Sequence, residues 1–154
     1  MAKNKEEKTN VMRVLEQKKI AYTAHTYPHE EGMAVDGVTV AKSMGFDPAI
    51  VFKTLVARGA SKQYYVFDVP VAENLDLKKA AKAVGEKSIE MIHQKELLPL
   101  TGYVHGGCSP VGMKKLFPTV FHETAENLET MIVSAGKIGY QVELCLLYTS
   151  PSPR

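Results

Sequence analysis

Lys53 is the residue of this chain whose surroundings most invite a chemical role. It lies in the run 51–57, whose other residues are apolar or β-branched, which is typical of a strand. Alternation along a strand places Lys53 on the same face as Val51 and Leu55. A lysine on such a face lies at a sheet edge, extends its ammonium group to water, or occupies a pocket where its charge is used. Taken alone, one of the first two positions is more common than a pocket, because lysine is almost never fully buried without a partner.

A glycine-rich segment at 101–112 is the second candidate for chemistry. Its adjacent glycines, Gly106 and Gly107, allow positive φ angles and a close approach of the backbone to a ligand. Their two N–H groups could hold an anion or a carbonyl oxygen, although most glycine-rich loops are only turns. Cys108 with His105 would offer a nucleophile and a base, but a small buried cysteine is the more common interpretation.

Ser134 is a third candidate, at the end of the predicted strand 131–134 and before the turn 135–137. A serine there either caps the turn or points into a site, and the structural role is the more common. The histidines show no metal-binding spacing, and no nucleophile elbow surrounds Ser109. The glycine patterns of the Rossmann fold and of the P-loop, which bind phosphate groups, are both absent from the sequence. The sequence therefore predicts neither a metal nor a cofactor.

The elements that must position these residues alternate irregularly between helix and strand. Apolar spacing, capping residues and turn signals predict helices at 11–18, 38–44, 77–84 and 93–98, the last ended by Pro99, and a short helical turn after Asp47. The same signals predict strands at 21–27, 51–57, 64–69, 89–91, 120–122, 131–134 and 140–144.

This order of elements lacks a strict strand–helix–strand repeat. It predicts an α+β fold, with a mixed, largely antiparallel, barrel-like sheet and helices packed outside it. A chain of 154 residues suits one domain, which we expect to span 1–144. The segment 145–154 carries Ser-Pro repeats that match neither a helix nor a strand, so we expect a disordered tail or a piece foreign to the fold.

Composition limits the classes of function. Hydrophobic residues make up 45% and charged residues 23%, which is ordinary for a globular protein. The net charge of +2 argues against wrapping a duplex, but it suits contact with one end of an RNA. The two cysteines form no CxxC pair, and no apolar run approaches the roughly 20 residues of a membrane helix. We expect a soluble cytoplasmic protein that does not associate with membranes.

Five short blocks together resemble one known family. They are His-Thr-Tyr at 25–27, Phe-Lys-Thr-Leu at 52–55, Leu-Asp-Leu-Lys-Lys-Ala-Ala-Lys at 75–82, Gly-Tyr at 102–103 with Gly-Gly-x-Ser-Pro at 106–110, and Val-Ser-x-Gly-Lys at 133–137. Each block is weakly specific, but their order and spacing resemble the YbaK/EbsC proteins. These are bacterial Cys-tRNA(Pro) deacylases related to the editing domain of some prolyl-tRNA synthetases.

The resemblance implies the YbaK editing-domain fold and hydrolysis of the ester between an amino acid and the 3′-terminal adenosine of tRNA. It implies that the substrate's own thiol attacks the ester, so no protein nucleophile is needed. The implied catalytic residues are Lys53, Gly106, Gly107 and Ser134, and the implied substrate-binding residues are Tyr27, Thr54, Ser109 and Pro110. The implied partners are the acceptor end of aminoacyl-tRNA and a prolyl-tRNA synthetase, with a monomer or a weak homodimer as the working unit.

Two departures and two alternatives accompany this interpretation. The family's Ser-Gly-Gly-Lys-Arg-Gly turn carries Ala135 and Ile138 here, and Ala135 would be strained at a positive φ. The same fold and site could instead serve Ala-tRNA(Pro) or several mischarged tRNAs, because a methyl group and a cysteine side chain differ little in an apolar pocket. A module that binds tRNA, a nucleotide or a synthetase without turnover is the other alternative.

Overall fold

The computed structural model describes residues 8–27, 36–115 and 117–144. The helices are α1 (Asn10–Gln17), α2 (Gly37–Ser43), α3 (Leu77–Val84) and α4 (Gln94–Thr101), with the short 3-10 helices η1 (Pro48–Ile50) and η2 (Glu123–Asn127). The strands are β1 (Thr23–Thr26), β2 (Phe52–Gly59), β3 (Tyr64–Pro70), β4 (Ile89–Met91), β5 (Thr119–Phe121), β6 (Met131–Ser134) and β7 (Tyr140–Leu144). The predicted tail 145–154 lies outside the described residues.

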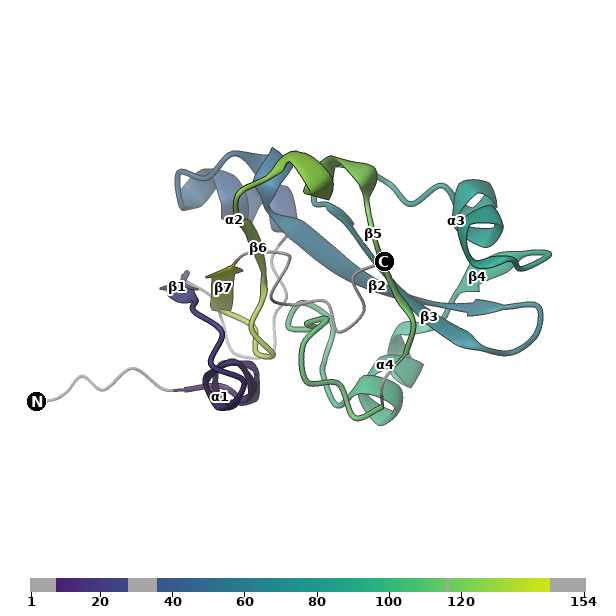
Figure 1. Ribbon diagram of the computed structural model, residues 1–154, viewed down its shortest axis with the longest axis horizontal. Helices are drawn as coiled ribbons and strands as arrows, with labels where there is room; N and C mark the ends of the chain where they lie inside the picture. The colour runs from purple at the N-terminus through teal and green to yellow at the C-terminus, as the bar shows by residue number, and fades with distance from the viewer. Residues whose placement is uncertain (1–7, 28–35, 116, 145–154) are drawn as a thin grey trace, which may run out of the picture.

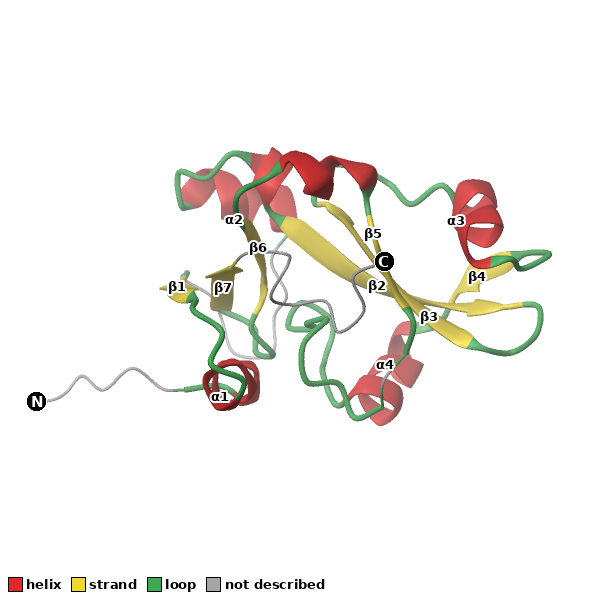
Figure 2. Cartoon of the chain, viewed as in Figure 1, coloured by secondary structure: helices red, strands yellow, loops and turns green. Residues whose placement is uncertain are grey.

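The strands form two sheets, one of three strands in the order β1-β7-β6 and one of four in the order β4-β2-β3-β5 (Figures 1 and 2). Every pairing is antiparallel except that of β3 with β5. A parallel bridge between Val51 and Ile132 joins the two sheets where β2 begins. The predicted α+β class and the mixed, largely antiparallel sheet are confirmed, with the sheet divided into two connected parts.

The long hairpin of β2 and β3 leaves part of one strand edge open. Its register runs from Phe52 opposite Pro70 to Arg58 opposite Tyr64. On its other edge, β2 pairs with β4 only over the stretch from Ala57 to Gly59. The edge of the first half of β2 therefore faces β6 and the glycine-rich loop rather than another full strand.

The main apolar core fills the space between the hairpin, the three-stranded sheet and α1. Its buried members are contributed by α1, β2, β3, α4, the glycine-rich loop, η2, β6, the turn after β6, and β7. The opposite face of the hairpin is covered by α3, whose Ala80 and Ala81 pack near Tyr65 and Phe67. Leu77, at the first turn of α3, is 38% exposed and lies beyond the edge of this contact.

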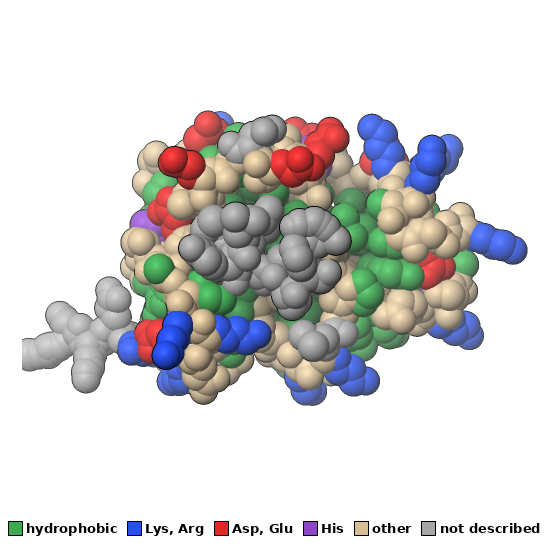
Figure 3. All heavy atoms as spheres, viewed as in Figure 1, with side chains coloured by type: hydrophobic (Ala, Val, Ile, Leu, Met, Phe, Trp, Pro, Cys, Tyr) green, Lys and Arg blue, Asp and Glu red, His purple; other side chains and the backbone are tan. Residues whose placement is uncertain are grey.

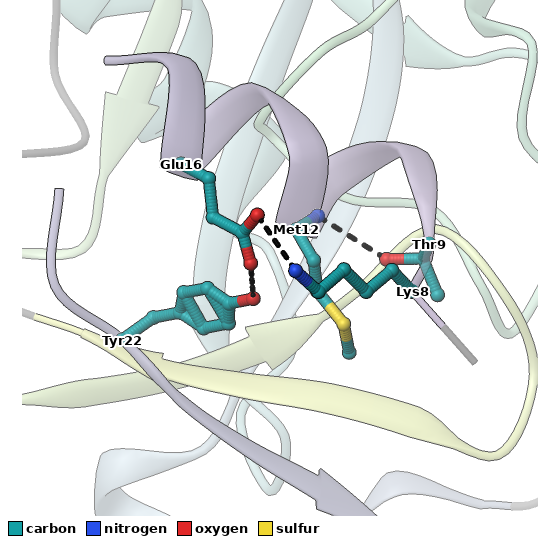
Figure 4. Close-up of polar contacts among 5 residues, drawn as sticks. All are labelled: Lys8, Thr9, Met12, Glu16 and Tyr22. Atoms are coloured by element: carbon teal, nitrogen blue, oxygen red, sulfur yellow. Dashed lines mark hydrogen bonds and ion pairs between the residues drawn. The ribbon is translucent and has the colours of Figure 1, made fainter. Parts of the chain in front are cut away.

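The N-terminal helix α1 is fixed at both ends by polar contacts (Figure 4). Thr9 is the N-cap, and its hydroxyl accepts the Met12 N–H at 3.3 Å. Glu16 accepts hydrogen bonds from Lys8 Nζ at 3.0 Å and from the Tyr22 hydroxyl at 2.7 Å. The Tyr22 contact joins the helix to the segment that leads into β1. Within the described residues, no helix has the length and apolar character needed to cross a bilayer.

The prediction that Pro99 ends the fourth helix is wrong, because α4 continues to Thr101. Proline has no N–H, so it leaves the Lys95 carbonyl four residues earlier without its helical donor, whereas the later carbonyl groups can still be bonded. The Thr101 hydroxyl donates to the Leu97 carbonyl at 2.8 Å, and the Gly102 N–H donates to the Leu98 carbonyl at 2.8 Å. These bonds complete the final turn in spite of the proline.

Candidate active site

A pocket of about 380 Å³ lies at the open edge of β2. Its walls come from the first half of β2, the start of α2, the ends of β1 and β6, β7, α4 and the glycine-rich loop. Of the residues predicted to form a site, the structure brings five together here: Tyr27, Lys53, Thr54, Gly106 and Ser134. The other three, Gly107, Ser109 and Pro110, do not line the pocket.

Lys53 lies half-buried in the wall formed by β2. Four consecutive residues, from Phe52 to Leu55, line the pocket, although their side chains alternate between the faces of the strand. The pocket therefore lies at the strand edge, where groups from both faces reach it. No hydrogen bond or ion pair joins Lys53 to another described residue. Its ammonium group is thus available to an anionic or polar ligand.

The two glycines of the loop have different structural roles. Gly106 has a φ of +93°, which side-chain-bearing residues rarely adopt, and its carbonyl accepts a long hydrogen bond of 3.4 Å from the Ser134 hydroxyl. A Cβ added to Gly107 would lie 3.0 Å from the backbone of Lys137 and Ile138. The close approach expected of Gly107 is therefore made to the chain's own β6–β7 turn rather than to a ligand.

Of the two backbone N–H groups expected to bind a ligand, those of Gly106 and Gly107, the Gly107 group is already hydrogen-bonded within the loop. The Gly107 N–H already donates to the Val104 carbonyl at 2.9 Å. For the Gly106 N–H, the described residues offer no hydrogen-bond partner. An oxyanion in this pocket would therefore be met by a single loop N–H, together with the ammonium group of Lys53.

Ser109 supports the loop from within, whereas Pro110 is only half-buried. Ser109 is fully buried, and its hydroxyl accepts the Val111 N–H at 3.2 Å. The Tyr103 hydroxyl donates to the Val111 carbonyl at 2.5 Å across the base of the same loop. These bonds hold the segment that presents Gly106 and Cys108 to the pocket.

The variant turn after β6 is compatible with its altered residues. The φ angle of Ala135 is not positive, so the alanine carries no left-handed strain, and the positive φ angles fall at Gly136 and Gly139. Ala135 and Ile138 are both buried. The side chain that replaces the family's arginine therefore packs into the protein.

Cys108 lines the pocket as a neutral thiol. Burial, followed by the nearby charge of Asp68, raises its pKa to about 12, against a smaller lowering by a hydrogen bond with Thr101. Nucleophilic cysteines require a thiolate, which neighbouring positive charge normally stabilises. The surroundings of Cys108 have the opposite effect, so the thiol is unsuited to attack an ester.

Asp68 is a residue of the site region that the sequence reasoning missed. It lies on β3 directly opposite Thr54, is fully buried, and accepts the Thr54 hydroxyl through Oδ1 at 2.5 Å. Its Oδ2 has no partner among the described residues. Burial raises the pKa of Asp68 to about 7, although the Thr54 hydrogen bond lowers it in part. An aspartate inside the apolar run 64–71 was the available signal.

Gln141 was also missed. It lies on β7 opposite Ser134, lines the pocket and is only 6% exposed. Its Oε1 has no hydrogen-bond partner among the described residues. Glutamine in a short strand normally indicates a solvent-facing position, so only the register of β6 and β7 shows that it belongs to the pocket.

Replacing Asp68 by asparagine is expected to change how stability depends on pH. The wild-type carboxyl titrates at about 7 when folded and near 3.8 when unfolded. The folded state therefore holds an extra proton between these values, and wild-type stability falls as pH rises toward 7. Between pH 5 and 8 this term amounts to about 3 kcal/mol and is absent from the variant. Urea unfolding at several pH values measures it, and parallel profiles for the two proteins would contradict the assignment.

Solved structures with the same arrangement define the class of the fold. The crystal structure of the hypothetical protein APE2540 aligns with a TM-score of 0.77 at 17% identity, covering 88% of this chain and 87% of that chain. The crystal structure of a protein assigned as a trans-editing enzyme for prolyl tRNA synthetase aligns with a TM-score of 0.73 at 23% identity, covering 90% and 88%. The protein is therefore an α+β domain of the fold that these structures share.

The chain belongs to the aminoacyl-tRNA editing domain family, whose model matches residues 29–147. It is 47% identical over 145 residues to EbsC of Enterococcus faecalis (strain ATCC 700802 / V583), which is assigned as a Cys-tRNA(Pro)/Cys-tRNA(Cys) deacylase. That alignment covers 94% of this chain and 88% of the relative. The resemblance to YbaK/EbsC proteins inferred from the five sequence blocks is confirmed.

Proposed function

We propose that this protein is a trans-editing hydrolase that removes cysteine from mischarged Cys-tRNA(Pro). The observation that carries the proposal is the half-buried Lys53, unpaired among the described residues, in a pocket with Gly106 and Ser134. It occurs in a chain of the editing family with 47% identity to a relative assigned to this reaction. An aminoacyl ester is already activated, so the site must mainly hold it and stabilise developing negative charge.

The roles of the lining residues follow from their chemistry. Lys53 binds the terminal phosphate or ribose of the tRNA, or the ester itself, as a compact cation. The Gly106 N–H meets the carbonyl oxygen of the ester, and the Ser134 hydroxyl holds the Gly106 peptide in place. Tyr27, which ends the β1 wall, stacks on the terminal adenine or contacts the amino acid.

The bond changes involve the substrate's own thiol. Its sulfur attacks the ester carbonyl carbon, a carbon–sulfur bond forms, and the carbon–oxygen bond to the ribose breaks. The sulfur gives up its proton, the released ribose oxygen takes one up, and water later opens the cyclic thioester to free cysteine. The neutral, buried Cys108 is consistent with a mechanism that uses no protein nucleophile.

Replacing Cys108 by alanine is expected to leave at least about a third of the deacylation rate, because its thiol takes no part in the bond changes. The rate of cysteine release from Cys-tRNA(Pro) measures this. Cys108→Ser, which keeps the volume and adds polarity, is the companion variant. A loss of 1000-fold or more in both variants, with the fold retained, would assign the nucleophile to the protein instead.

We further propose that the protein works in the cytoplasm on the acceptor end of the tRNA and leaves the tRNA body to a prolyl-tRNA synthetase. The mixture of acidic and basic side chains on the surface supports contact with only the acceptor end of the tRNA. In Figure 3, acidic groups gather along the upper edge, and lysines and arginines at the lower edge and at the end that carries α3. The working unit in this proposal is one domain spanning 1–144, as a monomer or a weak homodimer.

The deciding experiment follows amino-acid release from Cys-tRNA(Pro) and Ala-tRNA(Pro) with the purified protein. Release of cysteine alone is the expected result. Release of alanine would keep the site and change the cargo, because the pocket would then select by size rather than by thiol chemistry. Binding of both tRNAs without release would reduce the protein to a binding module.

A further inference from the structure

A buried carboxyl group lies directly behind one wall of the pocket. Thr54 lines the pocket, and its hydroxyl is joined at 2.5 Å to Oδ1 of Asp68 on the neighbouring strand. The two residues are register partners of the antiparallel hairpin, so the backbone fixes their side chains on the same face of the sheet. Asp68 itself does not line the pocket. Any effect it has on a ligand must therefore pass through Thr54.

The charge state of Asp68 decides what the Thr54 hydroxyl can do. When the carboxyl is ionised it only accepts hydrogen bonds, so Thr54 must donate its proton to it and present oxygen lone pairs to the pocket. When the carboxyl is protonated it can donate to Thr54, whose own proton then becomes free to point into the pocket. Ionised Asp68 thus makes Thr54 an acceptor aimed at the substrate.

We propose that Asp68 is a positioning residue that, through Thr54, takes up the proton of the substrate's thiol in the editing reaction. This inference rests on the proposed function. In one concerted step the sulfur–hydrogen bond breaks and the proton passes to Thr54 Oγ1. The original Thr54 proton passes to Asp68 Oδ1 at the same moment, and the sulfur lone pair is left to attack the ester. One proton enters the relay at the thiol and one reaches the carboxylate, so charge and atoms balance.

The surroundings of Asp68 support its use as a proton acceptor near neutral pH. Burial raises its pKa to about 7, close to the working pH of a general base. The titratable groups on the elements around it are Lys53 and Arg58 on β2, Tyr64 and Tyr65 on β3, His122 after β5, Glu123 and Glu126 on η2, and Tyr103, His105 and Cys108 of the glycine-rich loop. Of these, Cys108 and Tyr103 have raised pKa values and stay uncharged. The lysines of α3 are separated from Asp68 by the sheet, because α3 packs on the face opposite to the Asp68 side chain.

The Oδ2 atom of Asp68, which has no hydrogen-bond partner among the described residues, is a second geometric observation in favour of the relay. A buried carboxylate is normally satisfied by several hydrogen bonds or by a cation, because an unpaired buried charge is costly. Among the described residues, only the Thr54 hydroxyl reaches this carboxyl group. A purely structural role would be served at least as well by an apolar residue, as at the buried Val66 and Phe67 beside it. The single bond to Thr54 is the feature that a relay requires.

The test compares single-turnover cysteine release by wild type, Asp68→Asn, Thr54→Val and Thr54→Ser between pH 5.5 and 9. The wild-type rate is expected to rise with pH and level off near pH 7 to 8. At pH 7.5, Asp68→Asn and Thr54→Val are expected to be slower by about 10- to 100-fold, and their rates should keep rising toward the pKa of a free thiol. Thr54→Ser retains the hydroxyl and is expected to stay within about threefold of wild type.

Thr119→Val on β5 is the matched control, because it removes a half-buried threonine hydroxyl whose one hydrogen bond among the described residues is to the Phe117 carbonyl. Circular dichroism checks that each variant is folded. Wild-type rates in both Asp68→Asn and Thr54→Val, or a uniform loss with an unchanged pH profile, would overturn the relay. If Asp68→Asn fails to fold, the comparison of Thr54→Val with Thr54→Ser tests the relay, which requires the valine variant to be slow and the serine variant to stay close to wild type. A folded wild type that releases no cysteine overturns the proposed function, and the relay with it.

Discussion

Replacing Lys53 by alanine is expected to slow cysteine release from Cys-tRNA(Pro) by at least about 100-fold. The ammonium group is the one cationic lysine or arginine group among the described residues that line the pocket, and it has no partner among them. An electrostatic contact with developing negative charge, made where water is partly excluded, commonly contributes this much to a rate. Because the side chain makes no internal ion pair, the fold should not depend on it.

Lys53→Arg and Lys62→Ala make this result specific. Arginine keeps the charge but changes its shape and reach, so it should recover only part of the rate. Lys62 is exposed in the turn of the hairpin, so its loss should leave the rate unchanged. Single-turnover rates and melting temperatures are measured side by side. A Lys53→Ala variant that retains its rate would remove the lysine from the mechanism and, with it, the main support for the proposed site.

Replacing Gly107 by valine is expected to lower both activity and stability. Even a single Cβ at this position would lie 3.0 Å from backbone atoms of the β6–β7 turn, which cannot move aside as a flexible side chain would. The loop and the turn must separate, which is expected to cost about 1–3 kcal/mol of stability. The separation also moves the Gly106 carbonyl away from the Ser134 hydroxyl, so cysteine release should slow by at least about 10-fold.

Gly85→Asn is the control for a glycine replacement away from the pocket. Gly85 ends α3 with a φ of +76° and has open space around it, and asparagine tolerates this conformation. Its activity should match wild type, with only a small change in melting temperature. Denaturant unfolding and deacylation rates are compared for both variants. Equal behaviour of Gly107→Val and wild type would show that the loop does not depend on its contact with the turn.

Features set by neighbouring residues were determined by the sequence. Thr9 and Asp76 cap α1 and α3, and Gly85 ends α3, because capping is a contact between groups only a few residues apart. The strands were likewise evident from alternation and turn signals, apart from their exact ends. The five blocks that resemble the editing family also gave Lys53, Gly106 and Ser134, which the folded chain brings to one pocket.

Contacts between distant segments were decided only by the tertiary structure. Three features depend on groups that the local sequence does not specify. They are the parallel pairing of β3 with β5, the hydrogen bond made by the Gly107 N–H, and the continuation of α4 beyond Pro99. Asp68 is the clearest case, because its role depends on the register that sets it opposite Thr54. Local patterns determine which elements form, whereas the pairing of strands determines which side chains share a pocket and in what electrostatic surroundings.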